Sequence, residues 1–563
     1  MIAYTISWQQ PTERQFDISI SFTAASDEPR LLLPAWRPGR YLIQNYAANV
    51  TRWSAADRGG ERREMWKDGK SSWRVDARAG EDVNVRYRYY AGVLDAGSSF
   101  LDEKEAYFNG SNLFMMVEGL RGENARLSVG APAEWRIETQ LRREDENTFL
   151  ARDYDHLVDS PVIAAPSLTR HSFSEGEAMI HLIFVNDERI DTEQYIDPIR
   201  AIVRTQAALF GGLPLREYRF LIHIGDQWHG VEHEASCSIV AKRSDLLGTR
   251  KGDTGYDHFL SICSHEFFHL WNVKRILPSA FAPYDYSQET LTRLLWVMEG
   301  LTSYYGDLTL ACAGLWDEMR YLKHLATEIE TLENQPGREH LSLSQASFDS
   351  WLQSSVHDRP NALISFYNKG EIVSALLDLL ILRESGGAKS LDDVMRILWR
   401  AGKPLDEAGF ERAVASVCDA GDFFDRYVHG TDPLPYEELL GTAGVCIEWS
   451  PQQTEPSLGA TLRSDDGRLT VVSALRGGAA MNAGLLAGDE IVAIDGTRTI
   501  TDSDVATVLR SVDAGTPVEM LVARRGVIRT MTLAASSDPR VKIALRTTGD
   551  SALRARWLRR TNG

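Results

Sequence analysis

Short runs of alternating apolar and polar residues dominate the first third of the chain. The clearest are residues 16–22 (FDISISF) and 83–90 (VNVRYRYY), and turn-forming residues separate such runs. An alternation with a period of two is typical of strands that bury one face. Residues 1–168 are therefore predicted to form an all-β domain.

The pattern changes after this region. Two strand-like runs, Met179–Asn186 and Arg219–Ile224, are followed by long segments with apolar residues at helical spacing. In Tyr256–Ile276 no Gly or Pro interrupts that spacing, and Pro278 stands just beyond its end. We predict one helix over this segment, and a domain over residues 169–440 with an α/β half and a helical half.

Strand-like and turn-like segments return near the C-terminus. Residues 469–474 form an apolar run, and several glycines punctuate the stretch that follows. These features predict a third unit over residues 445–540, so the fold class is multidomain α+β. Residues 547–563 hold several arginines, and we expect a loose basic tail there.

Length and charge narrow the functional classes. The chain has 563 residues, enough for three or four domains at about 150 residues each. Its net charge of 61 minus 79, or −18, argues against nonspecific nucleic-acid binding. No apolar run reaches the ~18 residues of a membrane span, and the nearest, Ile372–Leu382, contains Asp378. Neither a nucleic-acid nor a membrane partner is expected.

The start of the chain and the cysteines bear on location. The opening MIAYTISWQQ lacks the basic and apolar regions of a signal peptide. The five cysteines are an odd number without metal-binding spacing, which suits reduced thiols in protein cores. A cytoplasmic location is expected, with a periplasmic one as the alternative if the start of the chain was processed.

The motif with the most chemical content is His265-Glu266-Phe267-Phe268-His269. On a helix, histidines at i and i+4 share a face and can hold one metal ion, and the glutamate between them can act on the attacking water. Polar residues on such an apolar helix are costly unless they are paired, and zinc is the common partner at this spacing. The alternative is two surface histidines around a solvated glutamate.

Two glutamates compete to be the third metal ligand. Glu289 lies in the predicted first turn of the next helix, where a carboxylate suits the helix N-terminus, so we interpret it as structural. Glu299 has Leu295 one turn before it and faces an apolar surface, where a buried anion needs a cation. Two histidines and Glu299 leave a fourth position open, as catalytic zinc requires. We predict one zinc ion per chain on His265, His269 and Glu299.

Around these residues the chain resembles the glycyl aminopeptidases, relatives of thermolysin and of the larger neutral aminopeptidases. The resemblance rests on HEFFHLWNVKR, PYDY and LLWVMEGLTSYYGDL. The 29 residues between His269 and Glu299 form a longer insert than in the larger neutral aminopeptidases and fit the glycyl aminopeptidases. The segment LPAWRPGRYLIQNYAANV is similar to the N-terminal domain of that family, although we interpret Trp36 and the turn at residues 37–40 as core and turn residues.

The resemblance implies further site residues. Gly230 and Glu232 precede the zinc helix as the amine-binding motif does, so Glu232 would bind the free α-amino group of a peptide. An exposed acidic loop is the alternative. Tyr367 opens a predicted amphipathic helix and matches the tyrosine that donates to the oxyanion. A packing role for it is the alternative, with Tyr304 and Tyr305 as reserve donors. The resemblance also implies a preference for glycine, alanine or other small N-terminal residues.

Residues 483–496 (AGLLAGDEIVAIDG) resemble a PDZ domain. Ile491 and Ile494 are expected to fill its core. Leu458, Gly459 and Ala460 are predicted to form the loop that binds the terminal carboxylate of an extended peptide or protein C-terminus. The alternative is a domain that only packs against the catalytic unit.

The sequence therefore predicts a zinc metallopeptidase that removes the first residue of peptides with a free N-terminus. Glu266 is the predicted general base and Tyr367 the oxyanion donor. A zinc endopeptidase would not need Glu232 to meet an amine. A PDZ-containing scaffold without turnover would not need the intact set of His265, Glu266, His269 and Glu299.

Overall fold

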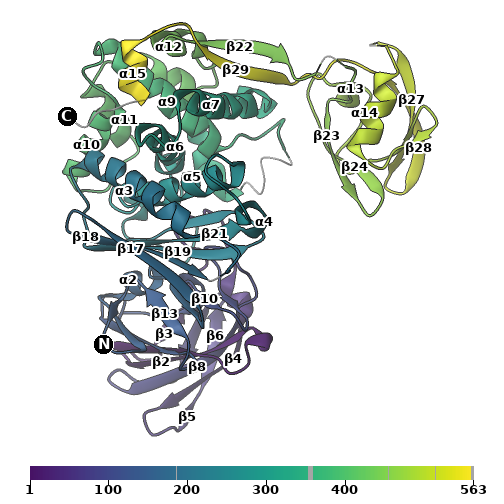
Figure 1. The fold of residues 1–563 in the computed structure, drawn as a ribbon. Coiled ribbons are helices and arrows are strands. Elements are labelled where there is room, and N and C mark those ends of the chain that lie inside the picture. The colour runs from purple at the N-terminus through teal and green to yellow at the C-terminus, as the bar shows by residue number, and fades with distance from the viewer. Residues whose placement is uncertain (186, 353–358, 454, 514, 559–563) are drawn as a thin grey trace.

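The computed structural model describes residues 1–185, 187–352, 359–453, 455–513 and 515–558. Its architecture confirms the predicted multidomain α+β class. A β-rich N-terminal domain packs beneath a mixed α/β and helical region, and a small C-terminal β domain stands to one side (Figure 1).

The N-terminal domain holds three sheets among the described residues. The largest has the strand order β14-β15-β12-β1-β2-β8-β4-β5, and the two four-stranded sheets have the orders β13-β16-β10-β9 and β11-β3-β7-β6. The strands are β1 (Ile2–Ser7), β2 (Gln15–Thr23), β3 (Arg30–Leu32), β4 (Val50–Asp57), β5 (Arg62–Arg63), β6 (Met65–Gly69), β7 (Ser72–Val75), β8 (Asp82–Tyr90), β9 (Phe100–Leu101), β10 (Ala106–Phe108), β11 (Met116–Val117), β12 (Ala125–Gly130), β13 (Arg136–Thr139), β14 (Arg142–Arg143), β15 (Thr148–Ala151) and β16 (Val162–Ala165), with short helices α1 (Gly110–Leu113) and α2 (Tyr154–Val158). The apolar positions of β2 and β8 are buried in one core, as their alternation predicts.

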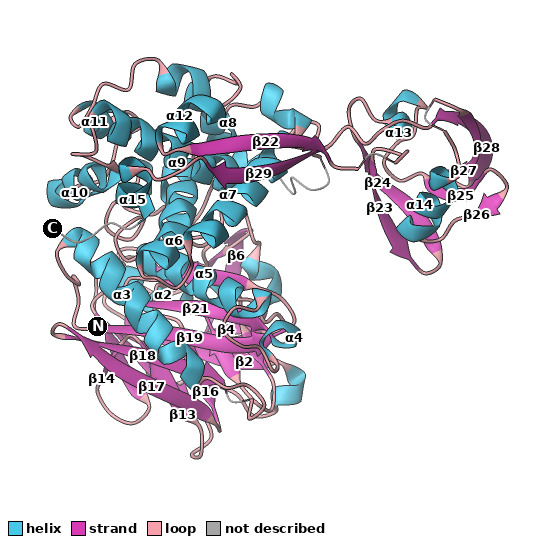
Figure 2. Ribbon diagram, turned by 45° about the horizontal axis from the view of Figure 1, so that its top comes forward, coloured by secondary structure: helices cyan, strands magenta, loops and turns pink. Residues whose placement is uncertain are grey.

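A five-stranded sheet begins the second region. It runs β17 (Leu168–Glu175), β18 (Ala178–Val185), β19 (Glu217–Gly225), β21 (Ser236–Lys242) and β20 (His229–Glu232) in spatial order. β18, β19 and β21 are parallel, and the two outer strands are antiparallel to their neighbours. The short strand β20 therefore forms one edge of this sheet. In Figure 2, β19 and β21 lie beneath α5 and α6.

Helices make up most of the remaining second region. They are α3 (Ile196–Phe210), α4 (Arg243–Leu246), α5 (Thr254–Phe268), α6 (Leu301–Cys312), α7 (Glu318–Glu333), α8 (Leu343–Phe348), α9 (Phe366–Glu384), α10 (Leu391–Ala401), α11 (Gly409–Ala415), α12 (Tyr436–Thr442) and α15 (Ala552–Leu558). The prediction that α9 is amphipathic is wrong, because every residue from Asn368 to Leu382 is buried. This helix lies inside the helical region and has neighbours on all sides. Its apolar run lies in the hydrophobic core of the helical region.

The predicted helix over Tyr256–Ile276 ends earlier than expected. α5 stops at Phe268, and the chain then winds through tight turns that include Val273 at a φ of 78°. The Asn272 side chain donates to the carbonyls of Val297 and Met298, 2.7 and 3.2 Å away. These buried hydrogen bonds compete with a continued helix, because an asparagine amide can satisfy backbone groups of another segment.

The C-terminal β domain contains β23 (Ala460–Asp465), β24 (Arg468–Ala474), β25 (Glu490–Ile494), β26 (Thr497–Arg498), β27 (Pro517–Arg524) and β28 (Val527–Ala534), with α13 (Ala479–Asn482) and α14 (Asp502–Arg510). Ile491 and Ile494 are fully buried in its core, as predicted. β22 (Val445–Pro451), which the predicted range included, pairs instead with β29 (Val541–Thr547). This two-stranded ribbon joins the domain to the helical region (Figure 1).

Two expectations about the outer parts of the chain are wrong. Residues 552–558 are not a loose tail, because α15 buries Trp557 and Leu558, and the buried Arg554 pairs with Glu318 at 3.0 Å. Arg559 and Arg560 lie outside the described residues. The cysteines are not all in cores either, since Cys446 is exposed on the ribbon strand β22.

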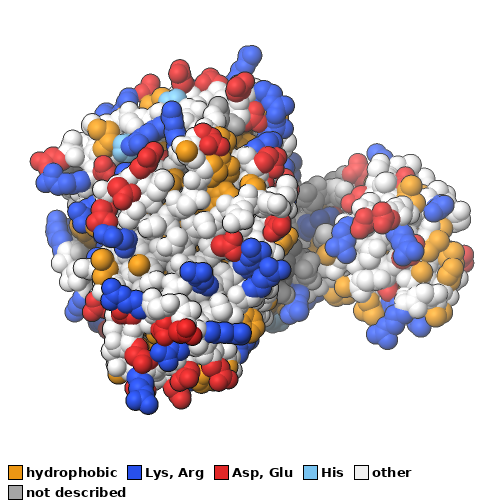
Figure 3. Space-filling model, turned by 90° about the horizontal axis from the view of Figure 1, so that it is seen from below, with side chains coloured by type: hydrophobic (Ala, Val, Ile, Leu, Met, Phe, Trp, Pro, Cys, Tyr) orange, Lys and Arg blue, Asp and Glu red, His pale blue; other side chains and the backbone are white. Residues whose placement is uncertain are grey.

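Charged side chains of both signs lie on the surface (Figure 3). On the face in Figure 3, acidic and basic side chains are interspersed and do not gather by sign. Among the described residues, no helix combines the length and the apolar character needed to span a bilayer.

Candidate active site and metal centre

The two motif histidines face the same point from the C-terminal end of α5. Their Nε2 atoms lie 3.1 Å apart. His269 Nδ1 lies 3.1 Å from the backbone carbonyl of Asn272, so Nδ1–H donates there and Nε2 is left as an acceptor. His265 Nδ1 lies 3.4 Å from Ser303 Oγ. Hydrogen bonds to Nδ1 that free Nε2 are the usual arrangement of metal-binding histidines.

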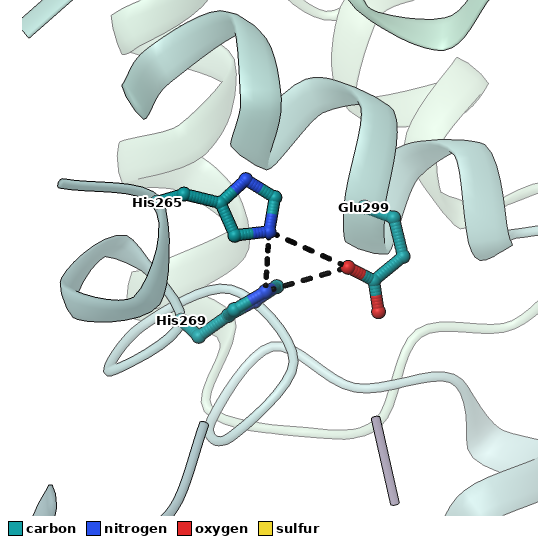
Figure 4. A group of neighbouring side chains, drawn as sticks. All are labelled: His265, His269 and Glu299. Atoms are coloured by element: carbon teal, nitrogen blue, oxygen red, sulfur yellow. Dashed lines mark hydrogen bonds and ion pairs between the residues drawn. The ribbon is translucent and has the colours of Figure 1, made fainter. Parts of the chain in front are cut away.

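Glu299 completes this group from a π-helical turn, Trp296–Gly300, that runs directly into α6. Its Oε2 lies 3.4 Å from His269 Nε2 and 3.7 Å from His265 Nε2 (Figure 4). Such turns inside a helix recur at functional sites because they redirect side chains. The competing Glu289 is exposed in a loop, not in a first helical turn, because the helix begins only near Leu295.

The chemistry of this group fits zinc. Two imidazoles and one carboxylate, with ligand atoms all within 4.8 Å of one another, match a catalytic zinc site with one open position. Although burial acts in the opposite direction, the two histidines hold the pKa of Glu299 well below its usual range. Burial likewise opposes charge on His269, but Glu299 raises the pKa of that imidazole to about 9. The carboxylate is thus ionised and pairs with His269, and a bound zinc ion would take the place of the proton on His269 Nε2.

Glu266 points into the same cavity, which has a volume of about 390 Å³. Its Oε2 is buried without a hydrogen-bond partner among the described residues. Burial raises the pKa of its carboxyl well above the usual range, and the charges of Glu232 and Glu299 raise it further. Gly230 is needed beside it, because a Cβ there would overlap the Glu266 side chain. The predicted Gly230 therefore leaves room for the base.

Glu232 ends the edge strand β20 and lies beside Glu266 and His269, with ligand atoms within 4.8 Å. It is 4% exposed, and its Oε1 has no hydrogen-bond partner among the described residues. The alternative interpretation of Glu232, as part of an exposed acidic loop, is therefore wrong. The next residue, His233, lies 3.3 Å from Asp159, which also pairs with Lys274 at 2.7 Å, so His233 belongs to a separate polar network.

Tyr367 lines the cavity from the first turn of α9, and 36% of its surface is exposed. Its ring stacks beside His265 with centroids 6.5 Å apart. A contact between Gly300 and Gly370 brings α9 this close, because a Cβ on Gly300 would lie 2.6 Å from Gly370 Cα. The reserve candidates point elsewhere: the Tyr304 hydroxyl donates to Asp378, and the Tyr305 hydroxyl donates to Asp392.

The N-terminal domain reaches this site, which the sequence analysis missed. The turn at residues 37–40 does more than fill a core, because a Cβ on Gly39 would lie 2.5 Å from Glu232 Oε2. One residue beyond that turn, the Tyr41 hydroxyl donates to Glu299. In the sequence, the segment WRPGRY gave one local indication of this contact, which is a turn glycine followed by an aromatic residue.

A second polar group lines the same cavity and was also missed. His324 Nε2 lies 3.0 Å from Asp307 Oδ2 and 3.1 Å from Glu371 Oε1. Burial disfavours charge on His324, but Asp307 and Glu371 raise its pKa well above the usual range. Burial and the nearby Glu328 raise the pKa of Glu371 to about 8. We interpret this group as a His324 imidazolium paired with the Asp307 carboxylate, with Glu371 as a second hydrogen-bond partner.

The predicted PDZ loop lies beside an edge strand. Leu458 and Gly459 directly precede β23, which forms one edge of the PDZ sheet next to α14. Gly459 has a φ of 61° and packs against Gly478 and Pro539. Carboxylate binding by Leu458, Gly459 and Ala460 stays a prediction.

Comparisons with known proteins found matches to three parts of the chain. Family models match the Peptidase M61 N-terminal domain at residues 3–166, M61 glycyl aminopeptidase at residues 258–373, and a PDZ domain at residues 470–524. No match was found among curated proteins. The crystal structure of an aminopeptidase N family protein from Idiomarina loihiensis is 29% identical, with a TM-score of 0.93, and the match covers 99% of this chain and 100% of that one. An M1 zinc metallopeptidase from Deinococcus radiodurans is 14% identical over 77% of this chain and 94% of that one, with a TM-score of 0.48. The chain thus matches two M61 segments and a PDZ domain, and the matched M61 glycyl aminopeptidase segment contains His265, Glu299 and Tyr367, which supports a zinc aminopeptidase.

Proposed function

We propose that the protein removes the N-terminal residue of peptides, with one zinc ion held by His265, His269 and Glu299. The observation that carries this proposal is Glu232, a buried carboxylate with one unpartnered oxygen beside the proposed base. A carboxylate held there suits a substrate ammonium group, because a charge-assisted hydrogen bond is strong where water is excluded. An endopeptidase has no use for that group at this place.

Each step of the proposed hydrolysis is assigned to the zinc ion or to a named residue. A zinc ion at this position would polarise the scissile carbonyl and make a water molecule more acidic. Glu266 would take the proton of that water and pass it to the leaving amine. Burial and two neighbouring carboxylates raise the pKa of Glu266, and a nearby dication acts in the opposite direction.

Tyr367 and the edge strand position the substrate in this proposal. The hydroxyl of Tyr367 lines the cavity beside His265, where it would donate to the oxyanion that forms on the scissile carbonyl. The edge strand β20 offers backbone groups along the same cavity, and an extended peptide can pair with such an edge. The N-terminus would then lie at Glu232.

Two finer proposals concern the ligands. The match to glycyl aminopeptidases supports a preference for glycine, alanine or another small first residue. The PDZ domain is proposed to bind an extended peptide or a protein C-terminus between β23 and α14, with the terminal carboxylate at residues 458–460.

The variant Glu232→Ala tests the aminopeptidase assignment. We expect kcat/KM on unblocked peptides with a small first residue to fall about ten- to several-hundredfold, because a charge-assisted hydrogen bond contributes roughly 1.5 to 3 kcal/mol. Zinc content should stay at the wild-type level. Glu234→Ala is the matched control, because Glu234 pairs with Arg152 and does not line the zinc-site cavity. Equal kcat/KM values for wild type and Glu232→Ala would show that Glu232 does not bind the substrate amine.

A further inference from the structure

Tyr41 belongs to the N-terminal β domain, yet its hydroxyl reaches the proposed zinc ligand. Tyr41 Oη donates to Glu299 Oε1 at 2.7 Å, across 258 positions of sequence. Both side chains are buried, with exposed fractions of 6% and 2%. A buried hydrogen bond from a hydroxyl to a carboxylate is short and strong because no water competes for it.

The two oxygens of Glu299 have different partners. Oε2 lies nearest to the Nε2 atoms of His265 and His269, as Figure 4 shows, whereas Oε1 accepts from Tyr41. Only Oε2 therefore faces the point where the three ligand atoms converge. A carboxylate with both oxygens free can bind a metal through either or both of them. The hydrogen bond from Tyr41 engages Oε1 and so favours metal binding through Oε2.

The ring of Tyr41 is fixed by aromatic neighbours. It stacks on Phe281, with centroids 6.0 Å apart and an interplanar angle of 9°. Trp351 and Phe366 meet it edge-on at 6.2 and 6.3 Å. These contacts place the hydroxyl without help from Glu299, because a packed aromatic ring has little rotamer freedom. The donor is therefore preorganised for the carboxylate.

We propose that Tyr41 is a positioning residue of the zinc site, which presents Glu299 to the metal through Oε2 alone. This proposal rests on the proposed function, since it takes Glu299 as a zinc ligand. Single-oxygen binding by Glu299 keeps the coordination number low and the fourth position available for chemistry. Outer partners of metal ligands usually contribute about ten- to a hundredfold in metal affinity. The β domain thus completes the catalytic centre.

Zinc affinity of Tyr41→Phe, measured by competition with a chromogenic chelator, tests this role. The variant keeps the ring and its packing and removes only the hydroxyl. We expect zinc binding about ten- to a hundredfold weaker than in wild type. In the cobalt-substituted protein, the visible absorption should weaken, because Glu299 can then bind through both oxygens and raise the coordination number.

Two comparison variants isolate the effect. Tyr46→Phe removes the hydroxyl of another buried tyrosine in the same domain, and we expect wild-type zinc affinity and an unchanged cobalt spectrum. Tyr367→Phe removes the proposed oxyanion donor, and we expect it to lower kcat. A loss of zinc affinity in Tyr41→Phe but not in Tyr46→Phe therefore supports the positioning role.

The outcomes separate this proposal from the proposed function. Wild-type zinc affinity and an unchanged cobalt spectrum in Tyr41→Phe overturn the role of Tyr41. Wild-type zinc affinity in Glu299→Gln overturns the proposed ligand set instead. If Tyr41→Phe does not fold, Tyr41→Gln and Tyr41→Leu replace it. The glutamine variant keeps a hydrogen-bond donor and should bind zinc more tightly than the leucine variant. Equal zinc affinities of these two variants overturn the proposal.

Discussion

Replacing Glu266 by glutamine is expected to remove almost all peptide hydrolysis while zinc stays bound. The amide cannot take a proton from water, and general-base catalysis contributes roughly a hundred- to ten-thousandfold in rate. Glutamine has nearly the shape of glutamate, so the cavity beside Gly230 accommodates it. We therefore expect kcat to fall by about a thousandfold, which corresponds to ~4 kcal/mol in the barrier.

Steady-state kinetics and metal analysis of the same preparation measure this effect. Glu407→Gln is the control, because Glu407 accepts hydrogen bonds from Thr292 and Arg293 and does not line the zinc-site cavity. Activity of Glu266→Gln within about tenfold of wild type, a loss of only ~1.4 kcal/mol, would mean that another group takes the proton.

Glu299→Gln is expected to lose zinc, whereas Glu289→Gln should keep it. Among the residues that the structure describes, Glu299 supplies the one carboxylate oxygen that lies against both motif histidines, and it is buried. A neutral amide there removes the negative charge that the dication needs, and we expect at least a hundredfold loss of zinc affinity, beyond the effect of an outer partner. Glu289 is exposed in a loop and serves as the matched control.

Elemental analysis after dialysis against a weak chelator distinguishes these variants. Circular dichroism of both proteins shows whether the fold is kept. Zinc loss from Glu289→Gln with retention in Glu299→Gln would reverse the assignment of the third ligand.

The sequence predicted what short-range patterns determine. The alternation in residues 16–22 and 83–90 predicted β2 and β8 because one face of each strand is buried. The spacing of His265 and His269 predicted a shared helical face, and the apolar surroundings of Glu299 indicated a buried anion. The structure brings these three side chains together from α5 and the π-helical turn.

Contacts between segments that are distant in the sequence could not be predicted from these short-range patterns. Nothing in the local pattern of Tyr41 shows that its hydroxyl contacts a residue 258 positions away. The same holds for His324, whose charge depends on Asp307 and Glu371 from two other helices. The early end of α5 depends on the buried contacts of Asn272 with a distant segment. The helical spacing of apolar residues does not show that buried side-chain hydrogen bonds will end a helix early.

Zinc titration of the metal-free wild-type protein tests whether it is a zinc aminopeptidase. A peptide with a free N-terminal glycine and its N-acetylated counterpart are incubated with increasing zinc. We expect cleavage of the free peptide to rise with zinc and to level off at one ion per chain, while the acetylated peptide stays intact. Equal cleavage of the two peptides, or full activity without zinc, would contradict a zinc aminopeptidase.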